Sequence, residues 1–454
     1  MDIRGKRVLV GGMARTGLAA VRLLLREGAI PFVSDSAAAS VVAEAVAELE
    51  ALGVAYECGG HSDRAWADAA LVVLSPGVPP RQPWIDRLRQ AGVPVMSELE
   101  LAYGYCRSRV LAVTGTNGKT TTTELLRFLV AETGHSVALA GNNAVPFSRA
   151  VTEDPAPEFL VLEVSSYQLE SACTFRPWIG AVLNVTPDHL ARHHTMQEYV
   201  AVKNRLFAWQ QPGDVAVLNA DDPSVAAMET RDGVAVSRFS RSAPQESGLW
   251  MDGDIIRCGA AEVARRADIP LPGDHNVENV LAALAMMRAG GFDWERTIAG
   301  LRAFQGVEHR IEFTASLNGV DFYNDSKSTN LESLRAALLS FDRPIVLIAG
   351  GRGKGSDYGV LGALIRTRVV HLITLGEDAP LLEAAFGAIV KTERAGDMAD
   401  AVARAARAAS PGDVVLLSPA CASFDLYNDF EHRGRVFKDA VHQYIQAGAA
   451  DKRN

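Results

Sequence analysis

A short segment in the first third of the chain carries residues of the types that bind polyphosphates. It reads V-T-G-T-N-G-K-T-T from Val113 to Thr121 and follows an apolar run. A buried strand that breaks into a glycine turn and then begins a helix leaves backbone N–H groups free at the positive helix end, where phosphate binds. Lys119 adds a mobile cation, and Thr120 adds a hydroxyl for Mg²⁺. We therefore predict a nucleoside triphosphate site at Gly115, Thr116, Asn117, Gly118, Lys119, Thr120 and Thr121.

The match to the common phosphate-loop spacing G-x-x-x-x-G-K-[ST] is incomplete, because position 113 is valine. Only the shorter form G-x-x-G-K-T is present. A glycine-and-threonine turn with an incidental lysine is the alternative. The strand expected before the turn and the helix expected over residues 120–132 favour the phosphate site.

Five polar side chains further along the chain are candidates for the same nucleotide site. Glu163 ends an apolar strand, and its carboxylate suits Mg²⁺, which prefers oxygen ligands, although a strand-end glutamate facing water is the alternative. His189 follows another strand end, where a metal or phosphate contact is expected. Lys203 lies in a helical stretch and has the pattern of an exposed surface lysine. Asn276 and Asn279 offer two amides near a helix start, which suits the edge of an adenine.

The N-terminal segment 11–17 resembles a dinucleotide-binding turn but fails its pattern. G-x-G-x-x-G is not met, because Met13 or Ala14 occupies the place of the second glycine. Asp35 ends the next expected strand, where such folds place an acid on a ribose or base, and Ser75 lies at the carboxyl end of the third. A nucleotide diphosphate is favoured over nicotinamide chemistry, and a purely structural turn is the alternative.

Polar segments also follow strand-like runs in the last third of the chain. They are residues 309–310, 324–330, 350–355 and 418–425. The carboxyl ends of parallel strands meet at one sheet edge, so Arg310, Lys327 and Lys354 are expected to neutralise a γ-phosphate and an acidic substrate there. Each segment taken alone is equally consistent with an ordinary polar loop.

Strands and helices are predicted to alternate along the whole chain, which is typical of parallel sheets covered by helices. We therefore expect an α/β protein of three domains. These are an N-terminal Rossmann-like nucleotide-binding domain (1–98), a central P-loop-type ATPase domain with a parallel sheet (99–306), and a C-terminal Rossmann-like domain (307–454). The main expected strands are 7–10, 31–33, 71–74, 110–113, 159–164, 181–185, 215–218, 344–349, 370–375 and 414–417.

Composition excludes several classes of protein. The formal charge of −9 argues against broad nucleic-acid binding. Five cysteines without C-x-x-C pairing predict reduced core thiols, with neither a disulfide framework nor a zinc site. No run approaches the roughly 18 apolar residues of a membrane span, and the N-terminal apolar run is too short for a signal peptide. We expect a cytoplasmic monomer.

Together these motifs resemble the Mur ligase family over nearly the full length. Beyond the phosphate loop, the resemblance rests on E-V-S-S-Y-Q-L-E at 163–170, N-V-T-P-D-H-L at 184–190, H-N-V-E-N at 275–279, N-D-S-K-S-T-N at 324–330, and S-P-A-C-A-S-F-D at 418–425 followed by F-E-H-R-G. The resemblance implies an ATP-dependent ligase of peptidoglycan synthesis that forms an acyl phosphate and releases ADP and phosphate. The N-D-S-K-x-T-N and S-P-A-x-A-S pair points to the member that adds D-glutamate to UDP-N-acetylmuramoyl-L-alanine.

The resemblance also implies roles for individual residues. Lys119 and Thr120 would hold ATP phosphates and Mg²⁺, with Glu163 and His189 in the metal shell. Lys203 matches the family lysine that becomes carbamylated, which would hold a second Mg²⁺.

The substrate contacts implied by the resemblance fall into three sets. Adenine and the rest of ATP would meet Asn276, Asn279, Arg310 and Asp325. The UDP-sugar would meet Arg15, Thr16, Asp35, Ser75, Asn142 and His189. D-Glutamate would meet Thr329, Lys354, Ser423 and Phe424, while Lys327 would offset charge on the transferring phosphoryl group. The family's G-N-I-G-x-P stretch reads G-N-N-A-V-P here at 141–146. Asn142 therefore matches the family's asparagine, whereas positions 143 and 144 differ from the family's residues.

Four competing interpretations remain to be distinguished. A folate polyglutamylating ligase shares the central chemistry but lacks a leading nucleotide domain, against which the first 98 residues argue. A dehydrogenase would need the glycine pattern that fails here. A non-catalytic nucleotide-sugar sensor would not turn over ATP, and an L-glutamate-specific relative is not separated by these loops.

Overall fold

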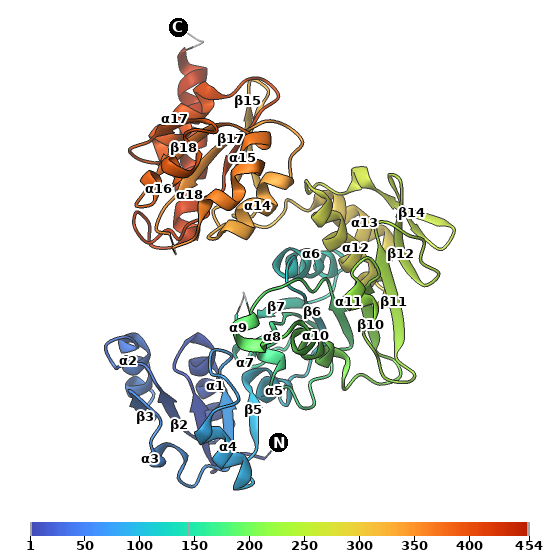
Figure 1. Cartoon of the computed structure of the whole chain (residues 1–454). Coiled ribbons are helices and arrows are strands. Elements are labelled where there is room, and N and C mark those ends of the chain that lie inside the picture. Colours follow the sequence, from blue (N-terminus) through green and yellow to red (C-terminus); the bar gives the residue numbers. More distant parts are fainter. Residues whose placement is uncertain (1, 143–144, 354, 452–454) are drawn as a thin grey trace. The chain divides into compact units, whose positions relative to one another are not determined.

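The computed structural model describes residues 2–142, 145–353 and 355–451. Strands form three sheets, which follow one another along the chain from blue through green to orange (Figure 1). Two compact units are present. The first comprises residues 1–269 and 277–302, and the second comprises residues 270–276 and 303–454. The predicted α/β class is confirmed.

The first sheet is fully parallel and has the strand order β3-β2-β1-β4-β5. Its order reverses at β1, which lies between β2 and β4, and such a reversal opens a crevice at the carboxyl ends of the strands. The strands are β1 (Arg7–Gly11), β2 (Ile30–Asp35), β3 (Ala55–Cys58), β4 (Leu71–Leu74) and β5 (Val95–Ser97). The helices are α1 (Arg15–Arg26), α2 (Ala43–Ala51), α3 (Asp63–Trp66) and α4 (Pro83–Gln90).

The second sheet places the phosphate-loop strand between two buried neighbours. Its order is β14-β13-β12-β11-β10-β9-β6-β8-β7, and only the edge strands β12 to β14 pair antiparallel. The sequence did not predict this edge, and β9 ends at Val182, before the expected 185. The strands are β6 (Arg109–Thr114), β7 (Val137–Gly141), β8 (Phe159–Glu163), β9 (Ile179–Val182), β10 (Val215–Asn219), β11 (Ala235–Ser240), β12 (Gly248–Asp252), β13 (Ile255–Cys258) and β14 (Ala261–Arg265).

The helices that accompany the second sheet are mostly short. The longest is α12, which begins in the second unit and continues in the first. The helices are α5 (Glu98–Tyr103), α6 (Lys119–Glu132), α7 (Phe147–Ala150), α8 (Ser166–Leu169), α9 (Leu190–His193), α10 (Met196–Asn204), η1 (Arg205–Phe207), α11 (Pro223–Ala226), η2 (Arg266–Asp268), α12 (Asp274–Ala289) and α13 (Trp294–Ala303).

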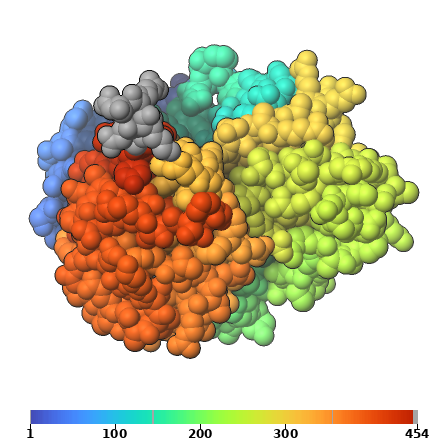
Figure 2. All heavy atoms as spheres, turned by 90° about the horizontal axis from the view of Figure 1, so that it is seen from above, coloured from blue at the N-terminus to red at the C-terminus, as the bar shows by residue number. Residues whose placement is uncertain are grey.

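The third sheet, of order β15-β16-β20-β17-β18-β19, separates two hydrophobic cores. Side chains alternate across a strand, so Ile345 and Leu347 of β17 enter one core while Val346 and Ile348 enter the other. The orange and red residues form one continuous body (Figure 2). The elements are β15 (Glu312–Leu317), β16 (Val320–Asn324), α14 (Leu331–Leu339), β17 (Ile345–Gly350), η3 (Tyr358–Leu361), α15 (Gly362–Arg368), β18 (Val369–Leu375), α16 (Ala379–Phe386), β19 (Lys391–Arg394), α17 (Met398–Ala408), β20 (Val414–Leu417) and α18 (Phe430–Asp451).

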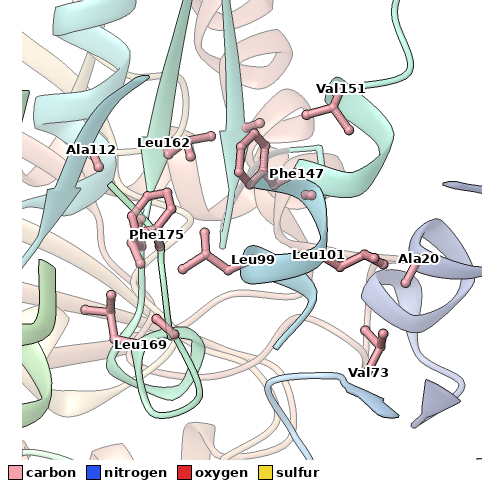
Figure 3. Close-up of a cluster of buried hydrophobic side chains, with 14 of the residues drawn as sticks. Ala20, Val73, Leu99, Leu101, Ala112, Phe147, Val151, Leu162, Leu169 and Phe175 are labelled. Atoms are coloured by element: carbon pink, nitrogen blue, oxygen red, sulfur yellow. The ribbon is translucent and has the colours of Figure 1, made fainter. Parts of the chain in front are cut away.

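One hydrophobic core runs from the first sheet into the second through helix α5. Leu99 and Leu101 of this helix are fully buried in that core. Ala20 and Val73 lie on the side of the first sheet, and Phe175 belongs to the second (Figure 3). Burial of apolar surface therefore ties the two sheets into one unit.

No helix within the described residues is long and apolar enough to cross a bilayer. The five cysteines are free thiols, as predicted, but Cys421 alone among them is buried and Cys173 is exposed. Cys58 and Cys106 are half-buried and pack against the core, so the prediction of core cysteines is wrong for the exposed Cys173.

We predict that Glu100→Gln destabilises the first unit. The carboxylate is buried and accepts hydrogen bonds from the backbone N–H groups of Cys173, Thr174 and Phe175 at 2.8, 2.7 and 3.1 Å. An amide presents one acceptor and turns an NH₂ group toward these donors, so the unfolding free energy should fall by about 2 kcal/mol. Thermal unfolding measures this loss. Glu153→Gln, at an exposed carboxylate, is the matched control, and equal Tm values for the two variants would contradict the prediction.

Candidate functional site

The predicted phosphate segment forms the turn between β6 and α6. The backbone N–H of Thr116 donates to the Asn184 carbonyl at 2.9 Å, and that of Asn117 donates to the Asn184 side-chain oxygen at 2.8 Å. Asn184 was given no role, because it fell inside the expected strand 181–185, whereas β9 ends at Val182. The Nζ of Lys119 donates to the carbonyl oxygens of Gly115 and Thr116 at 2.9 and 2.8 Å, so this side chain lies back over the turn.

Gly118 permits helix α12 to approach this turn. Its φ is +83°, in the left-handed region, and a Cβ added there would lie 2.0 Å from the Oδ1 of Asn279. The same Oδ1 accepts a hydrogen bond from Thr122 at 3.4 Å. The structure therefore brings Asn279 to the phosphate loop. Asn276 belongs to the second unit, where its Nδ2 donates to the Pro272 carbonyl at 2.7 Å.

Two oxygen groups beside the loop suit a hard cation. The Thr120 hydroxyl donates to Oε2 of Glu163 at 2.8 Å, and Asn142 Nδ2 donates to Oε1 at 3.0 Å. Glu163 is 2% exposed. The described residues hold no group of three His, Cys, Asp or Glu side chains that could bind a metal ion. Mg²⁺ commonly takes only one or two protein ligands beside water and substrate phosphates, so the Thr120–Glu163 pair fits it.

Lys203 is buried, and the expectation of a surface lysine is wrong. Its side chain is 1% exposed, and its Nζ donates to the Gly115 carbonyl at 2.9 Å and lies 4.6 Å from the Tyr199 ring centre. Burial, and next the charge of Lys119, lower the pKa of Lys203 well below its ordinary value. A polar helical pattern does not reveal which face of the helix packs against the protein. Tyr199, an aromatic residue one turn earlier on the same face as Lys203, was the available signal that this face is buried.

His189 begins helix α9 beside two polar partners. Its φ is +54°, and its side chain is 47% exposed. Nδ1 lies 3.2 Å from the Tyr167 hydroxyl, and Nε2 lies 3.3 Å from Oδ2 of Asp188. The His189 ring also packs 6.4 Å from that of Tyr199, whose hydroxyl is 3.2 Å from Oγ1 of Thr116. A chain of contacts thus joins His189 to the phosphate loop.

A cavity of about 310 Å³ lies at the carboxyl ends of β1, β2 and β4, where a reversal of strand order predicts a ligand site. Thr16, Asp35, Ser75 and Asn142 all line it, whereas Arg15 and His189, which the family resemblance grouped with them, do not. The Asp35 carboxylate accepts from the backbone N–H groups of Met13 and Ala37, both at 2.8 Å. Arg15 is outside this lining and donates from Nη2 to the Asn142 carbonyl at 3.4 Å.

The second unit holds a separate polar cluster at the ends of β16 and β20. Asp325 is buried and accepts from the Ser418 hydroxyl at 2.8 Å. Burial raises the pKa of Asp325 to about 7, against the opposing effects of that hydrogen bond and of the charge of Arg310. The Nε of Arg310 is buried without a hydrogen-bond partner among the described residues. An unpaired buried donor indicates a missing acceptor at this position.

A second turn in this cluster carries Lys327, whose Nζ lies 5.4 Å from the ring centre of Phe430. The buried guanidinium of Arg433 supports that turn, because it donates to the Ser326 carbonyl at 2.7 Å and to the Cys421 carbonyl at 3.1 Å. Burial lowers the pKa of Arg433 to about 10. The sequence analysis gave no role to Phe430 or Arg433, although both lie in its quoted F-E-H-R-G motif.

The predicted D-glutamate residues differ in exposure. Ser423 is 2% exposed, whereas Phe424 is 64% exposed. Thr329 is half-buried. Lys354 lies outside the described residues, and so do positions 143–144, where the sequence differs from the family's G-N-I-G-x-P stretch.

Three family models match successive parts of the chain. They are the MurD-like N-terminal domain at residues 6–97, the Mur ligase middle domain at 113–287, and the Mur ligase glutamate ligase domain at 309–421.

Curated relatives align with almost the whole chain. One from Pelotomaculum thermopropionicum, named UDP-N-acetylmuramoylalanine--D-glutamate ligase, is 44% identical and covers 97% of this chain and 98% of its own. A relative of the same name from Acidobacterium capsulatum is 41% identical over 99% of both. The crystal structure of UDP-N-acetylmuramate-alanine ligase MurC from Thermotoga maritima aligns with a TM-score of 0.59 and 19% identity, covering 97% of this chain and 99% of that one. This last likeness is one of fold.

We predict that Gly118→Ala costs far more stability than Gly253→Ala. Both glycines have positive φ, +83° and +56°, so both variants pay the left-handed penalty of about 1 kcal/mol. A Cβ at Gly118 would also collide with Asn279, whereas one at Gly253 meets nothing within 4 Å. Thermal unfolding of the two variants should show a larger fall in Tm for Gly118→Ala; equal falls would mean that the loop and α12 are not in close contact.

Proposed function

The chain belongs to the Mur ligase family, and we propose that it is an ATP-dependent ligase that joins D-glutamate to UDP-N-acetylmuramoyl-L-alanine in peptidoglycan synthesis, with release of ADP and phosphate. The substrate assignment is supported by relatives of that name at about 40% identity over the full length. The observation that carries the chemistry is the meeting of Lys119 and Lys203 at the Gly115 carbonyl beside the Thr120–Glu163 pair.

The order of chemical steps follows from leaving groups. An amine cannot displace oxide from a carboxylate at neutral pH, so the alanine carboxylate first attacks the γ-phosphate of ATP and becomes an acyl phosphate. The amine of D-glutamate then attacks the acyl carbon, and phosphate leaves. Lys119 and Lys327 are the cations that we assign to the phosphoryl oxygens. We assign the backbone N–H donors of Gly115, Gly118, Thr120 and Thr121 to the phosphates, because those of Thr116 and Asn117 already donate to Asn184.

Mg²⁺ would neutralise charge on the phosphoryl group that is transferred. Thr120 and Glu163 are the residues that we propose hold one ion. His189 and a carbamylated Lys203 would hold a second. A Lys203 amine with a lowered pKa supports carbamylation, because only the neutral amine attacks CO₂, forming an N–C bond and releasing one proton.

ATP and the nucleotide sugar would occupy different sheet edges. Asn276 and Asn279 are proposed for the adenine, and Arg310 and Asp325 for the rest of ATP; the unpaired Nε of Arg310 supports this assignment. The UDP-sugar would enter the 310 Å³ cavity and meet Thr16, Asp35, Ser75 and Asn142, with Arg15 and His189 nearby.

D-Glutamate would bind to the second unit through Thr329, Lys354, Ser423 and Phe424. Since the ATP loop belongs to the first unit, residues of both units are needed for the proposed reaction. We further propose that the enzyme works as a monomer in the cytoplasm, where ATP and nucleotide sugars are made, and that it binds no nucleic acid.

Phosphate release tests the proposed reaction. The purified protein is incubated with UDP-N-acetylmuramoyl-L-alanine, ATP and Mg²⁺, and D-glutamate, L-glutamate or meso-diaminopimelate is added in separate reactions. We expect sustained phosphate release with D-glutamate only, because the family's mechanism needs an acceptor amine to discharge the acyl phosphate. Equal release with and without any amino acid would refute the proposal, and dependence on L-glutamate would reassign the substrate.

Chemical rescue tests the carbamate on Lys203. We predict that Lys203→Ala lowers kcat by about 100-fold, because a metal-holding oxygen group is lost. Added formate or acetate should restore part of the activity by filling the vacated space with a carboxylate. Lys391→Ala, at an exposed lysine, is the control and should change nothing. Full activity of Lys203→Ala without added carboxylate would remove the proposed role.

A further inference from the structure

The side chain of Arg192, in α9, joins three segments that lie far apart in the sequence. Its Nε is 3.1 Å from both Glu170 oxygens, and its Nη2 donates to Oε2 of Glu170 at 2.7 Å. The same Nη2 donates to the carbonyls of Pro76 and Val78 at 3.5 and 3.2 Å. Its guanidinium carbon lies 4.8 Å from the centre of the Tyr167 ring. One planar group thus contacts an acid, a backbone loop and an aromatic ring.

The backbone loop held by Arg192 also forms a wall of the nucleotide-sugar cavity. Ser75, Pro76, Gly77 and Val78 all line that 310 Å³ cavity. Arg192 is absent from the lining, so it acts on the loop without facing the cavity. Two anchored carbonyls in a loop of four residues leave the loop little freedom to move.

The same guanidinium acts on His189 through Tyr167. The Tyr167 ring packs against Arg192, and its hydroxyl lies 3.2 Å from Nδ1 of His189. Glu170 contributes from the other side, because Oε1 lies 3.4 Å from Nδ1 of His193, and Nε2 of His193 is 2.9 Å from the Ser166 hydroxyl. Helices α8 and α9 are thereby locked around the residue proposed to contact the nucleotide sugar.

The Arg192–Glu170 ion pair is better placed to fix the position of its side chains than an ion pair on the surface. The side chains are 16% and 11% exposed, and the guanidinium meets both carboxylate oxygens. Exposed pairs contribute little, whereas forked, charge-assisted hydrogen bonds shielded from water are stronger and fix direction.

We propose that Arg192 is a positioning residue for the nucleotide sugar. Together with Glu170, it holds the 75–78 loop and His189 in place without touching the substrate. The proposal rests on the proposed function, since it names which substrate the pair aligns. Loss of Arg192 should weaken use of the nucleotide sugar most, because the 75–78 loop lines only the nucleotide-sugar cavity, whereas His189 is also assigned to the metal that accompanies ATP.

A second cavity makes the test sharper. This open cavity of about 520 Å³ is lined by Arg192 and Glu170 together with Pro79, Pro80, Arg81 and Arg205. A side chain deleted at Arg192 would leave a space that small solutes can reach from this cavity. Arg81 lines the same cavity and provides the matched control, because it is not part of the proposed positioning pair.

The experiment compares Arg192→Ala with Arg81→Ala by steady-state kinetics. We expect Arg192→Ala to raise the KM for UDP-N-acetylmuramoyl-L-alanine by about 10-fold or more, with a clearly smaller rise in the KM for ATP and with the KM for D-glutamate unchanged within about twofold. Arg81→Ala should match the wild type. Millimolar methylguanidinium should lower the raised KM, and methylammonium should do so less, because it lacks the planar fork. If Arg192→Ala does not fold, Arg192→Lys is measured by the same criterion of selectivity.

Three results would overturn the inference: an unchanged KM for the nucleotide sugar, a parallel rise of all three KM values, or no response to methylguanidinium in a folded Arg192→Ala. These outcomes can be distinguished from a failure of the proposed function. Turnover by the wild type tests the reaction, whereas the ratio of variant to wild type tests Arg192.

Discussion

Two lysine side chains donate to one backbone oxygen of the loop between β6 and α6. The Nζ atoms of Lys119 and Lys203 each lie 2.9 Å from the Gly115 carbonyl. Like charges repel strongly where water is excluded, and burial together with Lys119 depresses the pKa of Lys203. Such a site favours an anion, either a phosphate brought by a substrate or a carboxylate made on Lys203. The loop, helices α6 and α10 and the carboxylate of Glu163 surround these two lysines.

A chain of hydrogen bonds leads from this loop to the cavity of the first sheet. Thr120 donates to Glu163, Asn142 donates to the other oxygen of Glu163, and Arg15 donates to the Asn142 carbonyl. Asn142 also lines the cavity. The residues proposed for ATP and those proposed for the nucleotide sugar therefore share contacts. The hydrophobic core around α5 keeps the two sheets in one unit, so these contacts have fixed supports.

Patterns local in sequence predicted much of the fold. The strands at 71–74 and 414–417 have the predicted bounds, and β1, β6, β8 and β17 differ from prediction by one residue at one or both ends. These strands are buried on both faces, so they read as continuous apolar runs. The strands at the sheet edges, β3, β5, β7, β14, β15 and β19, were not predicted, because edge strands are partly exposed and lack such a run. The antiparallel strands β12 and β13 beside β14 were missed as well.

Residue types and spacing alone predicted the strand–turn–helix around Gly115 to Thr121 and the α/β class, because these depend on glycine and on apolar strand runs. The grouping of Thr16, Asp35, Ser75 and Asn142 came from the resemblance to the family. Only the tertiary structure decided that Lys203 is buried, that Asn279 reaches Gly118, and that Arg192 grips a loop more than a hundred positions earlier in the chain. Burial and contact between distant segments depend on which helix faces pack together. That choice arises from the summed packing of the whole core, which no local pattern encodes.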